Sequence, residues 1–164
     1  MTDFVQGIAA IFDRYKDLIE NIDHSVFQQS FNNSSSIGAH VRHVLDRSDC
    51  VVEGFSSGKI DYDKRRRNVD LENNPALCAK EFDRILAEIE GFSGGVGSVV
   101  EVSETLNCEG LKASMKSTYE RELLDIILHC THHMATMKFI LEKSGIEVDK
   151  DFGKNASTVI YEKG

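Results

Sequence analysis

The chain has 164 residues, with 19 lysines and arginines against 27 aspartates and glutamates, so its formal net charge is -8 at pH 7. This acidic balance argues against a nucleic-acid partner, because contacts with phosphate backbones require a basic surface. The length predicts one domain spanning residues 1–164, large enough to bury a core of its own.

The sequence carries no signal for export or for insertion into a membrane. It contains no run of about 18 consecutive apolar residues, the length that predicts a membrane span. Charged residues such as Asp13 and Arg14 interrupt the apolar segment that a signal peptide needs. The four cysteines are widely spaced, without a CxxC pair, so neither a disulfide framework nor a zinc ribbon is indicated. We therefore expect a reduced, cytoplasmic compartment and no membrane partner.

Two amphipathic helices are predicted in the first third of the chain. The first begins after Thr2 or Asp3 as a cap, and its apolar residues recur at alternating steps of four and three. The second follows the polar cluster at 32–36, which offers capping side chains, and ends before Gly58. The stripes comprise Phe4, Ile8, Ile11, Tyr15, Leu18 and Ile22 in the first helix, and Ile37, Val41, Val44, Val51 and Phe55 in the second.

A polar connection from 59 to 74 follows. It contains the basic cluster Lys64-Arg65-Arg66-Arg67, with acidic residues on both sides. Two interpretations of this cluster remain open: a solvated loop, or an anion-binding loop near a pocket. Pro75, the only proline, follows two asparagines and marks the first position of a third helix.

The remaining chain predicts two more helices and a pair of strands. The third helix is apolar at Cys78, Phe82, Ile85, Ile89 and Phe92, and is expected to end in the Ser-Gly-Gly run at 93–95. Segments 99–102 and 111–115 are rich in β-formers and predict a two-stranded ribbon. The fourth helix spans about 117–143, before Gly145. We therefore predict an all-α fold, a four-helix bundle with a short β-ribbon between helices three and four.

Five of the six histidines fall into two groups on the second and fourth predicted helices. His129 and His133 share one face at the border of the apolar stripe, at about 100° per residue, whereas His132 points further from the core. An i,i+4 pair of imidazoles can chelate a divalent ion, but two protein ligands are fewer than the three or four that such ions usually have. The third ligand has to come from another helix, and the spacing leaves both His40 and His43 open.

Other groups with reactive chemistry receive structural interpretations. Cys130 lies in the stripe of the fourth helix and is expected to be a core thiol. Cys50 lies two turns from His43, about 10 Å by helix rise, too far to share a metal ion. Glu122 is expected to pair with an arginine such as Arg42.

Two motifs contain the histidine groups: Ser36-Ile37-Gly38-Ala39-His40-Val41-Arg42-His43, and Arg121-Glu122-Leu123 followed by His129-Cys130-Thr131-His132-His133. These motifs resemble those of the DinB-like superfamily of metal-binding four-helix bundles. Tyr62-Asp63-Lys64-Arg65-Arg66-Arg67 and Asp151-Phe152-Gly153 are similar to a branch of largely uncharacterised DinB-like proteins. The likeness covers essentially the whole chain.

The resemblance implies a divalent metal ion, zinc, nickel or iron, held by His43, His129 and His133. The superfamily includes bacillithiol S-transferases, a mycothiol-dependent isomerase and a sulfoxide synthase of ergothioneine biosynthesis. We therefore expect a metalloenzyme that activates a thiol or water against a small electrophilic substrate, as a thiol S-transferase or a hydrolase. A low-molecular-weight thiol is then a candidate partner. The alternatives are a non-catalytic metal-binding module in stress response, and a metal that closes the fold without chemistry.

A homodimer is also expected. The first two helices carry apolar residues beyond one face, namely Phe12, Ile19, Leu45 and Val52. Two-fold association is the commonest oligomeric form, and dimers are usual among the proteins that the chain resembles. The other interpretation is that the connection at 59–74 and the C-terminal tail cover these residues.

Overall fold

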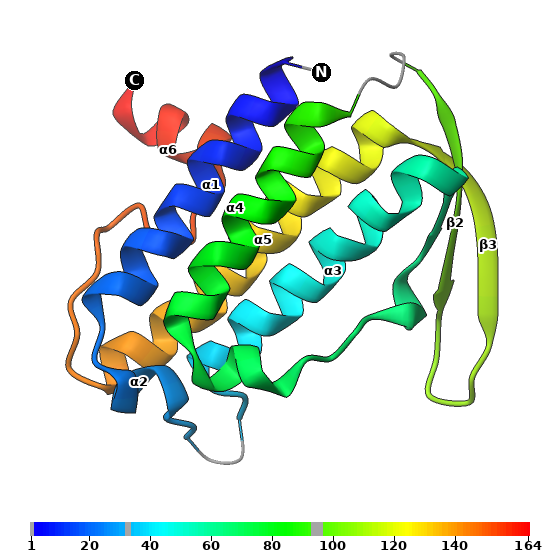
Figure 1. Ribbon diagram of the computed structural model, residues 1–164. Helices are drawn as coiled ribbons and strands as arrows, with labels where there is room; N and C mark the ends of the chain where they lie inside the picture. The colour runs from blue at the N-terminus through cyan, green and yellow to red at the C-terminus, as the bar shows by residue number, and fades with distance from the viewer. Residues whose placement is uncertain (1, 32–33, 93–96) are drawn as a thin grey trace.

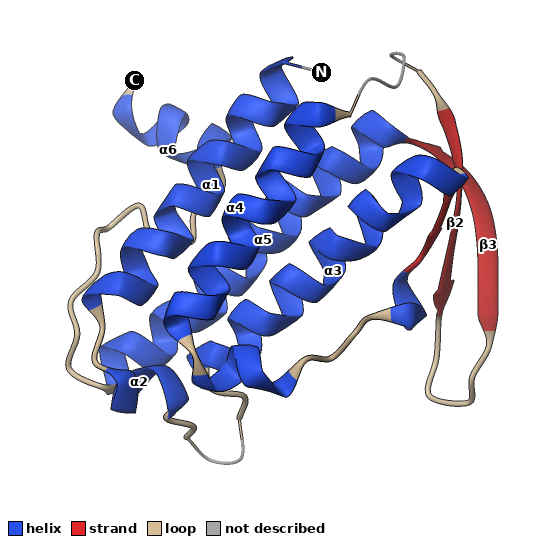
Figure 2. Ribbon diagram, viewed as in Figure 1, coloured by secondary structure: helices blue, strands red, loops and turns tan. Residues whose placement is uncertain are grey.

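A computed structural model describes residues 2–31, 34–92 and 97–164, which contain six α-helices, two 3-10 helices and three β-strands (Figures 1 and 2). The α-helices are α1 (Thr2–Asn21), α2 (His24–Gln28), α3 (Ile37–Ser57), α4 (Pro75–Gly91), α5 (Tyr119–Lys143) and α6 (Ala156–Lys163). The strands are β1 (Lys59–Asp61), β2 (Val99–Thr105) and β3 (Lys112–Thr118), and the 3-10 helices are η1 (Tyr62–Lys64) and η2 (Val69–Asn73).

The prediction of an all-α four-helix bundle is wrong. The strands form one mixed sheet in the order β1-β2-β3, in which β1 is parallel to β2 and β2 is antiparallel to β3. The protein is therefore an α+β fold. Strand β1 lies in the segment interpreted as a polar connection, where Ile60 is buried and pairs with Val102. Three residues are too few for the alternation that identifies a strand in a sequence, so β1 was missed.

Four long helices lie side by side, and the sheet lies on the side of α3 away from α1 (Figure 2). Helices α1 and α3 each contact both α4 and α5. Ser36, in the polar cluster expected to cap the second predicted helix, accepts a hydrogen bond from the Ala39 amide at 3.1 Å, and at the start of α4 the Asn74 side chain accepts one from the Leu77 amide at 3.0 Å. The third helix was expected to end at 93–95, which lies outside the described residues. None of the described helices is both long and apolar enough to cross a bilayer.

The apolar residues that suggested a dimer are buried within the single chain. Phe12, Ile19, Leu45 and Val52 are each at most 5% exposed. Phe152, in the segment before α6, is also buried and packs near the Arg14 guanidinium. These residues therefore give no argument for a second copy, and the homodimer stays a prediction without their support.

The first turn of α3, which leads into the upstream histidine pair, is in close contact with the chain around η2. A Cβ at Gly38 would lie 2.2 Å from the Glu72 carbonyl oxygen and 2.7 Å from a ring carbon of Phe27. We expect Gly38→Ala to lower the free energy of unfolding by roughly 1–2 kcal/mol, because overpacking against backbone outweighs the better helix propensity of alanine. Denaturant unfolding measures the change.

Gly91→Ala is the matched control, because Gly91 is also helical but a Cβ there would meet nothing within 4 Å. That variant should be stabilised by up to about 0.5 kcal/mol, less than in a helix interior, because Gly91 is the last residue of α4. Equal changes in both variants would show that the close approach at Gly38 has no energetic consequence.

Candidate metal centre

The two histidine groups meet at the contact between α3 and α5. His43, from α3, faces His129 and His133, which lie one turn apart on α5. One ring nitrogen from each of the three lies within 4.8 Å of the others. The ring centroids are 4.9 Å apart between His43 and each partner, and 4.5 Å apart between His129 and His133. Three imidazoles in this arrangement could hold a metal ion.

One atom of this group has no partner in the described part of the chain. Nε2 of His129 is buried and makes no hydrogen bond. A buried polar atom without a partner costs free energy, so such atoms are rare and usually have an explanation. A lone pair directed at a metal ion explains this one, and the donor set therefore fits a divalent cation.

The surroundings keep the three imidazoles in the form that binds metals. Burial, followed by the charge of Arg65, lowers the pKa of His43 to about 4. Burial and the neighbouring imidazoles lower the pKa of His129 and of His133 to about 3. All three rings are therefore neutral near pH 7, with a free lone pair for a ligand bond.

The other two candidate histidines lie beside the group. Nδ1 of His40 lies 2.9 Å from Nδ1 of His133, so one of these nitrogens donates to the other. His132 is exposed, as its position on the helix predicted, and its ring centroid lies 5.2 Å from that of His133. Neither belongs to the group of three among the described residues, so the group that could hold an ion includes His43 from α3 and not His40.

An arginine missed in the sequence lies one turn from His43 along α3. Arg47 donates to Glu104 on β2 at 2.8 Å and to Asp125 on α5 at 3.1 Å. Its guanidinium also lies over the Tyr62 ring, 3.8 Å from the centroid. Arg47 follows His43 by four residues and Asp125 precedes His129 by four, so helical spacing alone placed both next to the histidines.

The carboxylate of Glu122 has a different partner from the one expected. It accepts hydrogen bonds from Tyr62 at 2.6 Å and from Ser117 at 2.5 Å, and no ion pair joins it to an arginine among the described residues. Arg42 instead pairs with Asp46 and Glu72. The prediction of a Glu122–arginine pair is wrong, because the Tyr62 and Ser117 hydroxyls bind the carboxylate instead. Helical periodicity does not predict contacts with these two residues, which lie outside α5.

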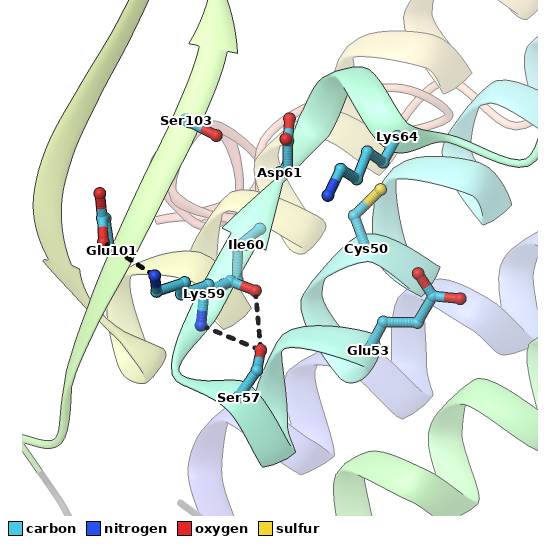
Figure 3. A pocket seen from close by; sticks show the side chains of 9 residues that line it. All are labelled: Cys50, Glu53, Ser57, Lys59, Ile60, Asp61, Lys64, Glu101 and Ser103. Atoms are coloured by element: carbon cyan, nitrogen blue, oxygen red, sulfur yellow. Dashed lines mark hydrogen bonds and ion pairs between the residues drawn. The ribbon is translucent and has the colours of Figure 1, made fainter.

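Cys130 is a core thiol, as the sequence predicted, and Cys50 lies apart from the three histidines. Cys130 is fully buried, and Cys50 lines a cavity of about 380 Å³ between α3, β1, η1 and β2 (Figure 3). Burial raises the pKa of the Cys50 thiol to about 12, so at neutral pH it is protonated and a poor nucleophile. Cys50 is not a member of the histidine group.

The lowered histidine pKa values predict an acid dependence for the metal-free protein. The folded state holds these rings neutral down to a pKa of about 3 at His129, whereas the ordinary value is 6.5. Their contribution to stability is therefore complete above pH 6.5 and is lost as the pH falls below it. With a chelator present, the free energy of unfolding should decline as the pH falls from 6.5 toward about 3.

A double variant, His129→Asn/His133→Asn, removes two of these groups and should show a shallower decline than the parent chain. The comparison isolates the histidines, because the carboxylates that also titrate in acid are the same in both proteins. Identical pH dependence in the two would contradict the assignment of neutral, buried imidazoles.

No family model matches the chain. It is similar to FK506-binding protein 5 of Rhizopus delemar, at 29% identity over 106 residues. The match covers 63% of this chain but spans 28% of that protein's length. At this identity and coverage, the likeness does not assign the chain to a family.

Proposed function

We propose that the protein is a metalloenzyme in which His43, His129 and His133 hold one divalent ion. The observation that carries the proposal is the buried, unpartnered Nε2 of His129, which lies within a group of three neutral imidazoles from two helices. The sequence resemblance to the DinB-like superfamily, whose ligand positions correspond to these histidines, supports it independently. Zinc, nickel and ferrous iron all suit imidazole donors.

His40 has a supporting role in this site. A neutral imidazole that binds a metal through one nitrogen carries its hydrogen on the other, and a partner for that hydrogen fixes the ring. Nδ1 of His133 lies against Nδ1 of His40, which leaves Nε2 of His133 as the ligand atom. His40 thus accepts from His133 and orients it.

The composition of the group favours chemistry over a purely structural role. Structural zinc sites have four protein ligands, whereas catalytic sites have three and keep a position open. Among the described residues, the group contains three histidines and no carboxylate or thiolate. A divalent ion supplies Lewis acidity when bound, lowering the pKa of a thiol or of water so that a nucleophile exists near neutral pH.

The proposed reaction is transfer of a thiol to a small electrophile. The thiol gives its proton to water, a sulfur–carbon bond forms, and the carbon–leaving-group bond breaks as the leaving group departs with the bonding electron pair. Hydrolysis, with water in place of the thiol, is the related reaction at the same site. The resemblance to bacillithiol S-transferases favours the thiol.

Cobalt substitution tests whether the site is open. Visible spectra of the cobalt-loaded protein should change when a thiol or azide is added, because either can enter a free coordination position. A spectrum that no added ligand alters would favour a closed, structural site.

Thiol transfer itself is tested with a chromogenic aryl halide and either cysteine or glutathione. Product formation should require metal and fall to the uncatalysed rate in the His43→Ala variant. Equal rates for the metal-loaded protein and this variant would refute an enzymatic role.

A further inference from the structure

Arg65, in the segment after η1, has its guanidinium against one of the three histidines. Its Nη1 lies 3.1 Å from Nδ1 of His43. A guanidinium only donates hydrogen bonds, so Nδ1 of His43 is the acceptor. A neutral imidazole has one acceptor nitrogen, and the ring hydrogen of His43 is therefore on Nε2 in this arrangement.

This hydrogen bond cannot coexist with a metal ion on a neutral His43. An ion at Nδ1 would need the lone pair that Arg65 uses. An ion at Nε2 would shift the ring hydrogen to Nδ1. The Nδ1–H group would then face the N–H of Arg65, and two donors cannot form a hydrogen bond with each other. In either case Arg65 leaves His43 when the ion binds, and in this respect the inference rests on the proposed function.

The guanidinium of Arg65 makes no ion pair with a carboxylate among the described residues, although its charge partly offsets the rise that burial causes in the pKa of Asp46. Arg42 and Arg47, the neighbouring arginines on α3, each form ion pairs with two carboxylates. Arg65 forms none with the described residues, and its Nε is buried without a hydrogen-bond partner. A half-buried cation with an unused donor is poised to accept an anion.

We propose that Arg65, released from His43 by metal binding, binds a carboxylate group of the substrate beside the metal. Nε–H and one Nη–H of a guanidinium form a fork that matches the two oxygens of a carboxylate. A divalent ion adds its positive charge to that of Arg65, and the combined potential favours an anionic ligand. The proposal narrows the thiol of the proposed reaction to one that carries a carboxylate, as cysteine and its peptides do.

The test is a titration of the cobalt-loaded protein, followed by visible absorption, with acetate as the carboxylate probe and imidazole as a neutral metal ligand. Arg65→Met should weaken acetate binding by at least about 10-fold, since a single charge-assisted hydrogen bond already contributes that much and the fork can form two. Its affinity for imidazole should change by less than about 2-fold, because imidazole needs only the metal. Arg67→Met is the matched control, an exposed arginine of the same segment, and should bind both probes as the parent chain does.

Metal affinity gives a second readout. Arg65→Met should bind cobalt more tightly than the parent chain, by up to about 10-fold, because no donor competes for His43 and one positive charge is gone. Arg65→Lys retains the charge but not the fork, and should bind acetate with intermediate affinity. If Arg65→Met does not fold, the acetate and imidazole titrations are done with Arg65→Lys instead.

The outcomes separate this inference from the proposed function. Failure of the parent protein to bind cobalt would refute the metal site and the role of Arg65 together. Cobalt binding with equal acetate affinity in the parent and Arg65→Met would overturn only the role of Arg65. Equal losses of acetate and imidazole binding would also overturn it, since they would show damage to the metal site instead of loss of anion recognition.

Discussion

Replacing His129 and His133 together with alanine is expected to abolish stoichiometric metal binding. Each ring contributes one neutral nitrogen to the group of three. Nε2 of His129 is buried and has no hydrogen-bond partner among the described residues. Loss of residues that merely orient a ligand costs 10–100-fold in metal affinity, so loss of two ligands should exceed about 100-fold. Isothermal titration with zinc measures the affinity, and elemental analysis of the purified protein measures the content.

Two single variants serve as controls for this result. His132→Ala lies on the same helix but removes an exposed ring outside the group, and should retain metal. His24→Ala removes a histidine that contacts the Asn73 carbonyl, and should retain it as well. The same metal content in the double variant and the parent would exclude the site. Metal loss in His40→Ala with retention in His43→Ala would move the third ligand one turn along α3.

Arg47→Met is expected to destabilise the fold by about 3 kcal/mol, the lower end of the cost of breaking a buried ion pair. The Arg47 side chain is 15% exposed and joins α3 to carboxylates on β2 and α5. Its removal leaves Glu104 and Asp125 without this partner, and it removes the cation above the Tyr62 ring. Denaturant unfolding of the metal-free protein measures the change without a contribution from the metal.

Arg121→Met is a matched control, because Arg121 pairs with the same Asp125 at 3.2 Å but its side chain is 56% exposed. Exposed pairs of this kind contribute about 0.5 kcal/mol or less. Similar losses in the two variants would show that Arg47 contributes no more than an ordinary surface pair. Arg47→Lys should recover little stability, since lysine lacks the planar fork that reaches two carboxylates.

The sequence predicted the parts of the structure that are encoded by local periodicity. The long helices follow from apolar residues spaced at three and four, and the cap at Ser36 follows from the polar cluster at 32–36, whose side chains can bond free amides. The same rule placed His129 and His133 on one face. His43 lies against this pair only because α3 packs against α5. The spacing of residues does not predict that packing, and the expectation came from the family resemblance.

The features that were missed depend on contacts between distant segments. Strand β1 exists because its backbone pairs with β2, about 40 residues later in the chain, and three residues carry no period of their own. Helix α6 has no buried residue, so no apolar stripe marks it. Arg65 reaches His43 from a basic cluster whose residues look alike in the sequence, and only the fold distinguishes the one that faces the histidines.

The most direct test of the metal site is a crystal structure of the zinc-loaded protein, with anomalous diffraction collected on both sides of the zinc edge. We predict one anomalous peak between α3 and α5, within about 2.0–2.1 Å of one nitrogen each of His43, His129 and His133. The Arg65 guanidinium should be displaced from His43 in that structure. A zinc ion bound elsewhere, or bound by fewer than these three imidazoles, would contradict the proposed function.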